Sequence, residues 1–240
     1  MGFSECDAEL LVARFYAYKL FHVVLSAEPT DEVMDALLSD NALDAAAVLT
    51  EGGYDVSLLV AAVEELRARR AAEPDFVAAA HKAFNQLFLV PGGKSVKLYE
   101  SVYAGQMNTI FGETTIDMRR YLREAGLASD AEGNFPEDCL PLMLDFMAAL
   151  AQRSWEAAQA GDDACAGEPA VDTPAGTGDD AFAAGLRVQK AFADEHLGAW
   201  LGSVVASLDA HDASRIYFAL GQAMEQFVES DKRWLSAACA

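Results

Sequence analysis

The run Pro-Gly-Gly-Lys-Ser at residues 91–95 comes closest to a pattern for phosphate chemistry. In a phosphate-binding loop, glycine amides surround a phosphate while a Lys and a following Ser or Thr contact the terminal phosphates and magnesium. Gly93, Lys94 and Ser95 match the end of that pattern. Phe88 stands where the first glycine is required, and a predicted helix precedes the run in place of a strand. The run therefore favours an ordinary Pro-Gly turn, and nucleotide hydrolysis stays open as an alternative with no other support.

Residues that could ligate a metal or act as nucleophiles are scattered along the chain. No HxxxH, HExxH or CxxC spacing occurs, and no Ser or Cys lies in a nucleophile elbow. We therefore expect no catalytic residues, no metal and no cofactor, although a site assembled only in three dimensions stays possible. The wide cysteine spacing predicts reduced thiols and no disulfide framework. The residues in question are His22, His81, His196, His211, Cys6, Cys139, Cys165 and Cys239.

The composition predicts a globular acidic protein. Hydrophobic residues make up 52% of the chain and charged residues 23%, which is enough apolar surface to form a core. A net charge of -21 argues against nucleic acid as a partner and would attract cationic peptides, although it would also simply maintain solubility. The first residues, MGFSECDAELL, do not have a positive segment followed by an apolar one, so we expect no export signal, and no stretch approaches the roughly 18 apolar residues of a spanning helix. We expect a cytoplasmic protein without stable membrane insertion.

Apolar residues recur at spacings of three and four, which predicts an all-α protein. We expect a single globular helical bundle of about ten helices over residues 1–240, with a possible hinge near 129–134 and a flexible linker at 161–180. Thr30 is suited to begin a helix and Gly126 to end one in a left-handed conformation. The predicted helices span about residues 5–26, 30–39, 41–50, 55–72, 74–89, 102–111, 114–125, 137–160, 180–208 with a break near 194, and 211–236.

Several separated segments carry a resemblance to a known family. They are FNQLFLVPGG at 84–93, KLYESVY at 97–103, FGETTIDMRRYLREAGL at 111–127, FPEDCLPLMLDFM at 135–147 and FADEHLGAW at 192–200. In this order they resemble the TorD/DmsD/NarJ family of redox-enzyme maturation chaperones, over about residues 84–200. The chain departs from the family at Cys139, where the family has His, at Val90, where it has Gly, and at Ala199, where it often has Pro.

The resemblance implies a TorD-like fold and a cytosolic chaperone that is not an enzyme. Such a chaperone binds the N-terminal twin-arginine signal of a molybdenum-type oxidoreductase catalytic subunit and delays its export until cofactor insertion and folding are complete. The expected partner is therefore a signal peptide or the N-terminus of an oxidoreductase subunit, bound by a monomer or homodimer. One alternative is a NarJ-like assembly chaperone for a reductase subunit that is not exported. Another is a helical protein-interaction module without a link to export.

An aromatic groove is the first part of the predicted peptide-binding site. Phe84, Leu87 and Phe88 lie on one helical face, and the turn at Pro91 allows later tyrosines to return to the same surface. A groove floored by aromatic residues could bind an apolar helix of another chain, but the same stripe could instead belong to the core. The full set of predicted peptide-binding residues is Phe84, Leu87, Phe88, Pro91, Tyr99, Ser101, Tyr103, Asp138, Cys139 and His196.

An acidic element is the second part. The family has an acid-His pair in its peptide-binding site, and the resemblance places it at Asp138 and Cys139. A thiol cannot replace the proton chemistry or hydrogen bonds of an imidazole, so we expect Cys139 to contribute apolar packing. Aromatic residues flank His196 on its helix. It is therefore either a core histidine whose ring nitrogens have hydrogen-bond partners within the protein, or part of the groove. We expect Asp138, together with Asp145 and Glu195, to meet the paired arginines.

Overall fold

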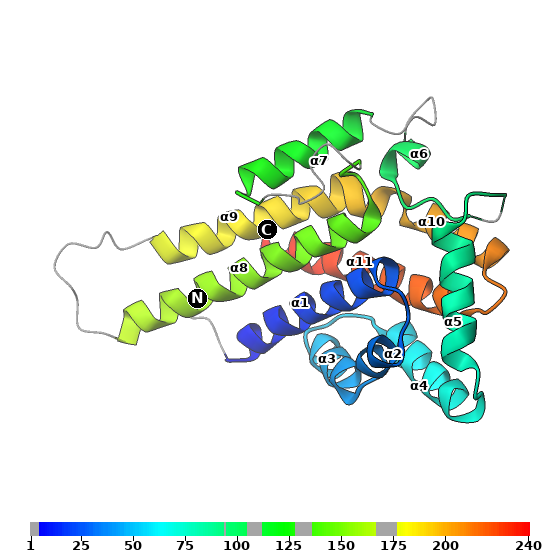
Figure 1. The fold of residues 1–240 in the computed structure, drawn as a ribbon. Helices are drawn as coiled ribbons and strands as arrows, with labels where there is room; N and C mark the ends of the chain where they lie inside the picture. The colour runs from blue at the N-terminus through cyan, green and yellow to red at the C-terminus, as the bar shows by residue number, and fades with distance from the viewer. Residues whose placement is uncertain (1–4, 94, 105–111, 128–135, 167–176) are drawn as a thin grey trace.

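The computed structural model describes residues 5–93, 95–104, 112–127, 136–166 and 177–240. These residues form eleven α-helices and two short π-helical segments, η1 and η2, together with one isolated β-bridge. Figure 1 shows their arrangement, and the expected all-α fold of about ten helices is confirmed. The elements are α1 (Glu5–Ser26), α2 (Asp31–Leu37), α3 (Asp40–Glu51), α4 (Ser57–Ala72), α5 (Phe76–Phe84), η1 (Asn85–Leu89), α6 (Glu100–Ala104), α7 (Glu113–Glu124), α8 (Leu140–Ala166), α9 (Thr177–Phe192), η2 (Ala193–Leu197), α10 (Gly198–His211) and α11 (Ile216–Ala238).

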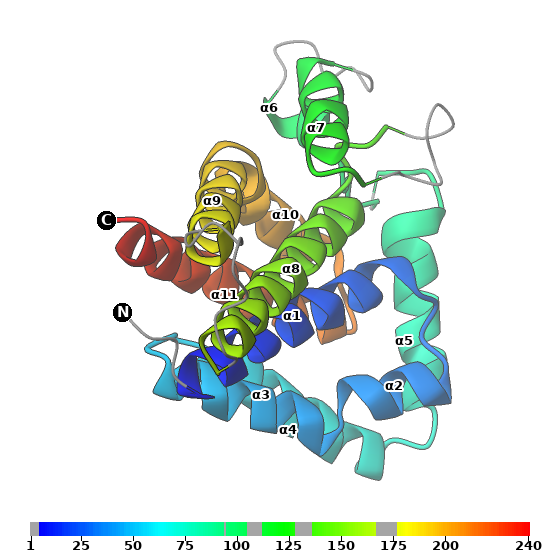
Figure 2. The ribbon, with the colours of Figure 1, turned by 90° about the vertical axis from the view of Figure 1, so that its left-hand side faces the viewer.

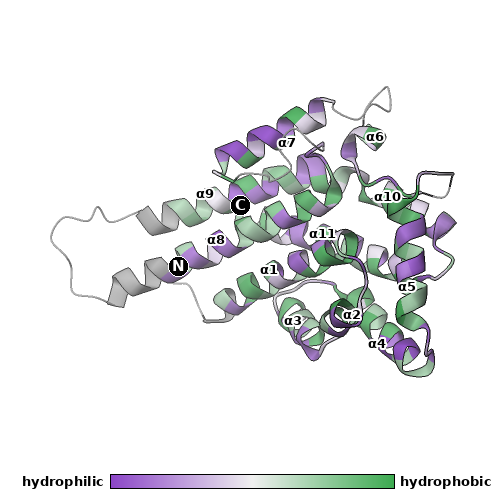
Figure 3. Ribbon diagram, viewed as in Figure 1, coloured by the Kyte–Doolittle hydropathy of each residue, from purple (hydrophilic) through white to green (hydrophobic). Residues whose placement is uncertain are grey.

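The pair of long helices α1 and α8 lies at the centre of the bundle (Figures 1 and 2). Helix α3 packs against α1, α9 packs against α8, and α11 packs against α4 and α10. The buried faces follow the apolar spacing of the sequence, and each fully buried Leu or Phe contributes roughly 1.5–3 kcal/mol to folding. Helix α7 differs from the core helices, because most of its residues are hydrophilic (Figure 3). Large side chains of this core include Leu11, Phe21, Phe146, Phe192 and Phe227.

A buried ionic cluster joins three helices inside this core. The guanidinium of Arg14, on the apolar face of α1, donates from Nε to Asp231 Oδ1 at 2.6 Å and from Nη2 to Gln189 Oε1 at 2.9 Å. The hydroxyls of Tyr18 and Tyr54 also donate to Asp231, at 2.6 and 2.7 Å. Burial and the Asp231 carboxylate raise the pKa of both tyrosines, which therefore remain protonated donors. The cluster fixes α1, α9 and α11 relative to one another.

Two predicted helix ends have the expected geometry. Thr30 Oγ1 accepts the Val33 amide at 3.3 Å and begins α2. Gly126 ends α7 at a φ of 62°, a left-handed conformation in which glycine avoids the Cβ clash of other residues. The Leu127 amide donates to the Leu122 carbonyl at 2.8 Å, as in a Schellman motif. The possible hinge at 129–134 lies outside the described residues.

The observed bounds correct several expectations about helix length. The first six residues of the expected linker, 161–166, belong to α8, and 177–180 belong to α9, while 167–176 lie outside the described residues. The helix expected at 180–208 contains η2 at 193–197, close to the predicted break. Helix α8 begins at Leu140, later than expected, because the residues before it pair with the segment around Tyr99.

Candidate peptide-binding site

A small apolar hollow lies beside η1, and we call it the 88–99 hollow. It has a volume of about 240 Å³ and includes four of the predicted site residues, Phe88, Pro91, Tyr99 and Cys139. The side chains of Leu89 and Val90 are 54% and 56% exposed there. The complete lining is Phe88, Leu89, Val90, Pro91, Ser95, Val96, Lys97, Leu98, Tyr99, Cys139 and Pro141.

The local backbone explains why these residues surround a hollow. The π-helical turn η1 interrupts the regular helix directly after Phe84, and such turns are frequent at functional sites. After the turn at Pro91 the chain returns, and the Val96 amide donates to the Leu87 carbonyl at 2.8 Å. Tyr99 then forms a β-bridge with Cys139, directly before α8. Segments from two distant parts of the chain are therefore held side by side by backbone hydrogen bonds.

Phe84 and Leu87 do not form the floor of this hollow, contrary to the sequence-based expectation. Both are buried in the core. The Phe84 ring lies 6.1 Å from Tyr217 of α11, and the Phe88 ring lies 5.3 Å from the same tyrosine. The stripe is therefore mainly a core stripe, and of these three residues the half-buried Phe88 is the one that also lines the hollow.

Tyr103 and Ser101 also lie away from the predicted groove. The Tyr103 ring stacks on Trp200 of α10, with the centroids 5.4 Å apart, and its hydroxyl donates to the Lys97 carbonyl at 2.9 Å. Ser101 is buried, and its amide donates to Asp138 Oδ2 at 2.8 Å. Both residues hold the segment 97–104 onto the bundle and do not line the hollow.

Asp138 is fully buried and joins three elements, which corrects the expectation that it meets a client's arginines. Besides the Ser101 amide, its carboxylate accepts the hydroxyls of Thr114 and Thr115, each at 2.9 Å. These donors belong to the first turns of α6 and α7, where helix dipoles favour a negative charge. The neighbouring Glu137 is also buried and accepts from Arg119 at 2.7 Å. The two acids therefore anchor α6 and α7 to the start of α8.

Cys139 is partly buried at the edge of the hollow. Burial raises the pKa of its thiol, and the nearby carboxylate of Asp138 acts in the same direction. The group is therefore a neutral thiol at physiological pH, which suits apolar contact and not charge recognition.

His196 is a buried, partnered histidine outside the hollow. Its Nδ1 lies 3.0 Å from Glu100 Oε2, and its ring lies 5.4 Å from the ring of Tyr121. Burial lowers the pKa of His196, but the hydrogen bond and charge of Glu100, assisted by Asp117 and Glu195, outweigh burial and raise it. The pair therefore fastens α6 to η2, and His196 is not positioned to contact a ligand in the hollow.

The two other predicted acids are accessible. The carboxylate of Asp145 pairs with Lys19 across the surface between α8 and α1, and both side chains are more than a third exposed. Glu195 is exposed and accepts the hydroxyl of Tyr121 at 3.0 Å. Asp145 lies one turn along α8 from Pro141, which lines the hollow.

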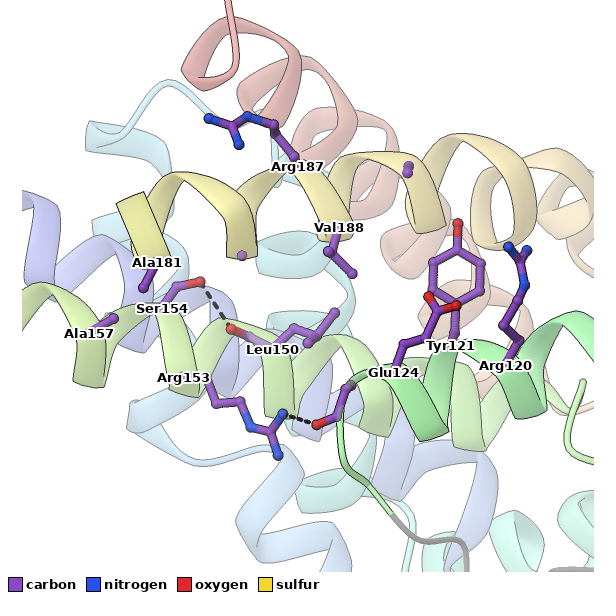
Figure 4. Close-up of a pocket in the computed structure, with 13 residues that line it drawn as sticks. Arg120, Tyr121, Glu124, Leu150, Arg153, Ser154, Ala157, Ala181, Arg187 and Val188 are labelled. Carbon is purple, nitrogen blue, oxygen red and sulfur yellow. Dashed lines mark hydrogen bonds between the residues drawn. The ribbon is translucent and has the colours of Figure 1, made fainter. Parts of the chain in front are cut away.

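A larger cavity of about 550 Å³ lies between α7, α8 and α9, with Leu150 and Val188 among its apolar walls (Figure 4). Its three arginines do not converge on one point. Arg153 donates to the carbonyl of Ala125, Arg120 pairs with Asp117 at 3.1 Å, and Arg187 points away from Leu150 and Val188 in Figure 4. The arginines therefore do not form a convergent set that would bind a small anion.

The described residues give no support for metal or phosphate chemistry. Within them no group of three or more His, Cys, Asp or Glu side chains could hold a metal ion. Lys94 lies outside the described residues, and the π-helical η1 precedes the run 91–95 where a phosphate loop needs a strand. No helix in the described part of the chain has the length and apolarity needed to cross a membrane.

The described residues form an all-α bundle with an exposed apolar hollow. The family model described as nitrate reductase delta subunit matches residues 56–206, more than half of the chain. The protein therefore belongs to the nitrate reductase delta subunit family, which confirms the resemblance to the TorD/DmsD/NarJ chaperones.

Relatives from three organisms are named as chaperones. The chain is 28% identical over 181 residues to the chaperone protein TorD of Vibrio cholerae serotype O1 (strain M66-2), covering 75% of this chain and 71% of that one. It is 25% identical over 230 residues to TorD of Shewanella pealeana, covering 92% and 88%. A perchlorate reductase assembly chaperone protein of Dechloromonas aromatica is 31% identical over 156 residues, covering 65% and 59%. Members of this family are redox-enzyme maturation chaperones and not enzymes.

Proposed function

We propose that this protein is a cytoplasmic chaperone that binds the N-terminal twin-arginine signal of a molybdenum-type oxidoreductase catalytic subunit and delays export until cofactor insertion and folding are complete. The family match, with relatives named as chaperones, is the observation that carries the proposal. The 88–99 hollow supports it, because Leu89 and Val90 offer exposed apolar side chains to a peptide. Binding would remove these side chains from water, which favours association.

The accessible acids supply the proposed contacts to the paired arginines. Asp145 is close along α8 to Pro141 at the hollow, and its exposed ion pair with Lys19 is a weak one that an incoming arginine could replace. Arginine forms bidentate contacts with carboxylates, which lysine does not. The net charge of -21 would accelerate the approach of a basic peptide, most strongly at low salt. Charge therefore increases the association rate of the signal peptide, and the apolar contacts supply most of its affinity.

Titration calorimetry tests this function with a synthetic signal peptide that has two consecutive arginines and an apolar stretch of about 12 residues. We expect micromolar or tighter binding, and weaker binding when both arginines become glutamine. Val90→Asp should weaken binding, because it places a charge against the bound apolar stretch. Ile116→Asp on α7, at a side chain that is 63% exposed and outside the hollow, is the matched control. Failure of the native peptide to bind would refute the signal-binding function.

A second candidate is an assembly chaperone that holds the N-terminal helix of a reductase subunit without requiring paired arginines. The description of the matching family as nitrate reductase delta subunit and the name of the perchlorate reductase assembly chaperone favour it. The same titration separates the two candidates. Equal affinity for the native and the Arg-to-Gln peptides supports the assembly chaperone, whereas a large loss on substitution supports signal recognition.

A further inference from the structure

A second apolar surface lies at the other end of the α1–α8 pair, and we call it the α1–α3–α8 groove. Its volume is about 520 Å³, within the range of ligand-binding clefts. Each helix contributes residues at helical spacing, including Val12 and Tyr16 from α1, Asp44 and Val48 from α3, and Trp155 from α8. Three helix faces therefore border one trough, and Figure 2 shows α1, α3 and α8 side by side.

The apolar side chains of the groove are incompletely covered by the fold. Val12 is 44% exposed, although it lies in the middle of a helix whose other face is core. Tyr16, Val48 and Trp155 are partly exposed beside it. A contiguous set of exposed aliphatic and aromatic residues is typical of a surface that binds another chain. A trough between packed helices also has a suitable shape for the side-chain ridge of an additional helix.

The charges of the groove are of one sign. Glu9 of α1 and Asp44 of α3 are exposed, and within the described part of the chain neither carboxylate has an ion pair. None of the residues that line the groove is Lys or Arg. Tyr16 and Trp155 add aromatic faces, which attract cations through their π systems. The groove therefore combines an apolar floor with groups that favour positive charge.

We infer that the α1–α3–α8 groove binds the far end of the client's N-terminal segment as a helix, with apolar side chains on Val12, Tyr16, Val48 and Trp155. Positively charged groups other than the paired arginines, which meet Asp145, lie against Glu9 and Asp44. This inference rests on the proposed function, since it assigns a surface to the same client. A segment with positive charge at the end of an apolar stretch has the complementary chemistry, and a helix bound in a groove is a common mode of peptide recognition.

The two surfaces are close enough for one segment to reach both. Pro141 lines the 88–99 hollow and Trp155 lines the groove, and both belong to α8. Their separation of fourteen residues corresponds to about 21 Å along the helix axis. A bound helix of about 20 residues is about 30 Å long, so a signal of ordinary length spans this distance.

Surface variants of the full chain test the groove with the same synthetic peptide. Val12→Glu places a charge on the apolar floor, and Asp44→Lys reverses the charge at the rim. We expect Val12→Glu to weaken binding by about tenfold or more, which corresponds to a free-energy change of about 1.4 kcal/mol. Asp44→Lys should weaken binding mainly at low salt, because an exposed charge interaction is screened. Leu58→Glu and Glu64→Lys on α4 are matched controls, and both should retain wild-type affinity.

The outcomes separate this inference from the proposed function. If the wild-type protein binds the peptide and Val12→Glu binds it equally well, the groove assignment is wrong while the chaperone function stands. If the wild-type protein does not bind, both fail. Sedimentation of the free protein supplies the remaining alternative: a dimer that Val12→Glu converts to monomers would assign the groove to a second copy of this chain and overturn the inference. Unchanged circular dichroism confirms that each variant is folded.

Discussion

Removal of the Asp138 carboxylate should destabilise the protein strongly, because this buried side chain connects the starts of α6, α7 and α8. It accepts three hydrogen bonds, and bonds to a charged group contribute about 1.5–3 kcal/mol each. Water can replace part of the loss at the part-buried Thr114, but the Ser101 amide and the Thr115 hydroxyl stay buried. We therefore expect Asp138→Ala to lower the free energy of unfolding by about 3–5 kcal/mol.

Urea unfolding followed by circular dichroism measures this change. In thermal unfolding, a loss of about 4 kcal/mol corresponds to a fall in Tm of about 8–16 °C for a chain of this size. Asp138→Asn keeps one acceptor oxygen and should lose only about 1–3 kcal/mol. Asp145→Ala, which removes an exposed ion pair from the same helix, is the control and should change stability by at most about 1 kcal/mol. If Asp138→Ala has wild-type stability but loses peptide binding, Asp138 contacts the client and its structural role is refuted.

Three further predictions concern stability. Asp231→Asn should lower the free energy of unfolding by about 3–5 kcal/mol in urea titrations, because it leaves the buried charge of Arg14 without its counter-ion. The pKa of His196 is higher in the folded protein than in the unfolded chain. The pairing of its charged form with Glu100 therefore stabilises the fold fully below about pH 6.5, the unfolded pKa, and this stabilisation is lost as pH rises through the folded pKa. The stability difference between wild type and His196→Gln should therefore be larger at about pH 6 than at about pH 9, and equal differences would contradict the Glu100 pairing. Gly126→Ala should lower Tm by a few degrees, since a left-handed Ala costs about 1–2 kcal/mol, and an unchanged Tm would contradict the cap.

Local sequence signals predicted the helices well, because they depend on neighbours along the chain. The apolar spacing from Glu5 to Ser26 predicted the bounds of α1, and the position of Gly126 after the last apolar turn predicted its left-handed cap. Both features are determined by residues within a few positions of one another. The same holds for Thr30 at the start of α2.

The candidate site was harder to predict, because burial depends on residues distant in the sequence. The spacing of Phe84, Leu87 and Phe88 identifies a shared face but not its neighbour, and that neighbour is Tyr217 on the last helix. Asp138 likewise has the sequence pattern of an exposed helix start, and its partners lie on two other elements. A periodic pattern therefore does not distinguish a groove floor from a core stripe.

Two residues of the first helix depart from its regular pattern. Arg14 interrupts the apolar stripe of the first helix, and a charged residue at a core position indicates a buried partner. Val12 is an apolar residue that lies outside the buried stripe of the same helix and is 44% exposed. The pairing of α1 with α3 and with the distant end of α8 could not be read from either pattern, so the groove was not predicted.

The identity of the protein that co-purifies with this chaperone from its own cells tests the central claim most directly. We predict that mass spectrometry identifies the catalytic subunit of a molybdenum-type oxidoreductase, and that deleting the subunit's N-terminal segment abolishes the complex. The Ile116→Asp variant should retain this partner, and Val90→Asp should retain less of it. Recovery without any oxidoreductase subunit, or a complex that survives deletion of the N-terminal segment, would contradict the account.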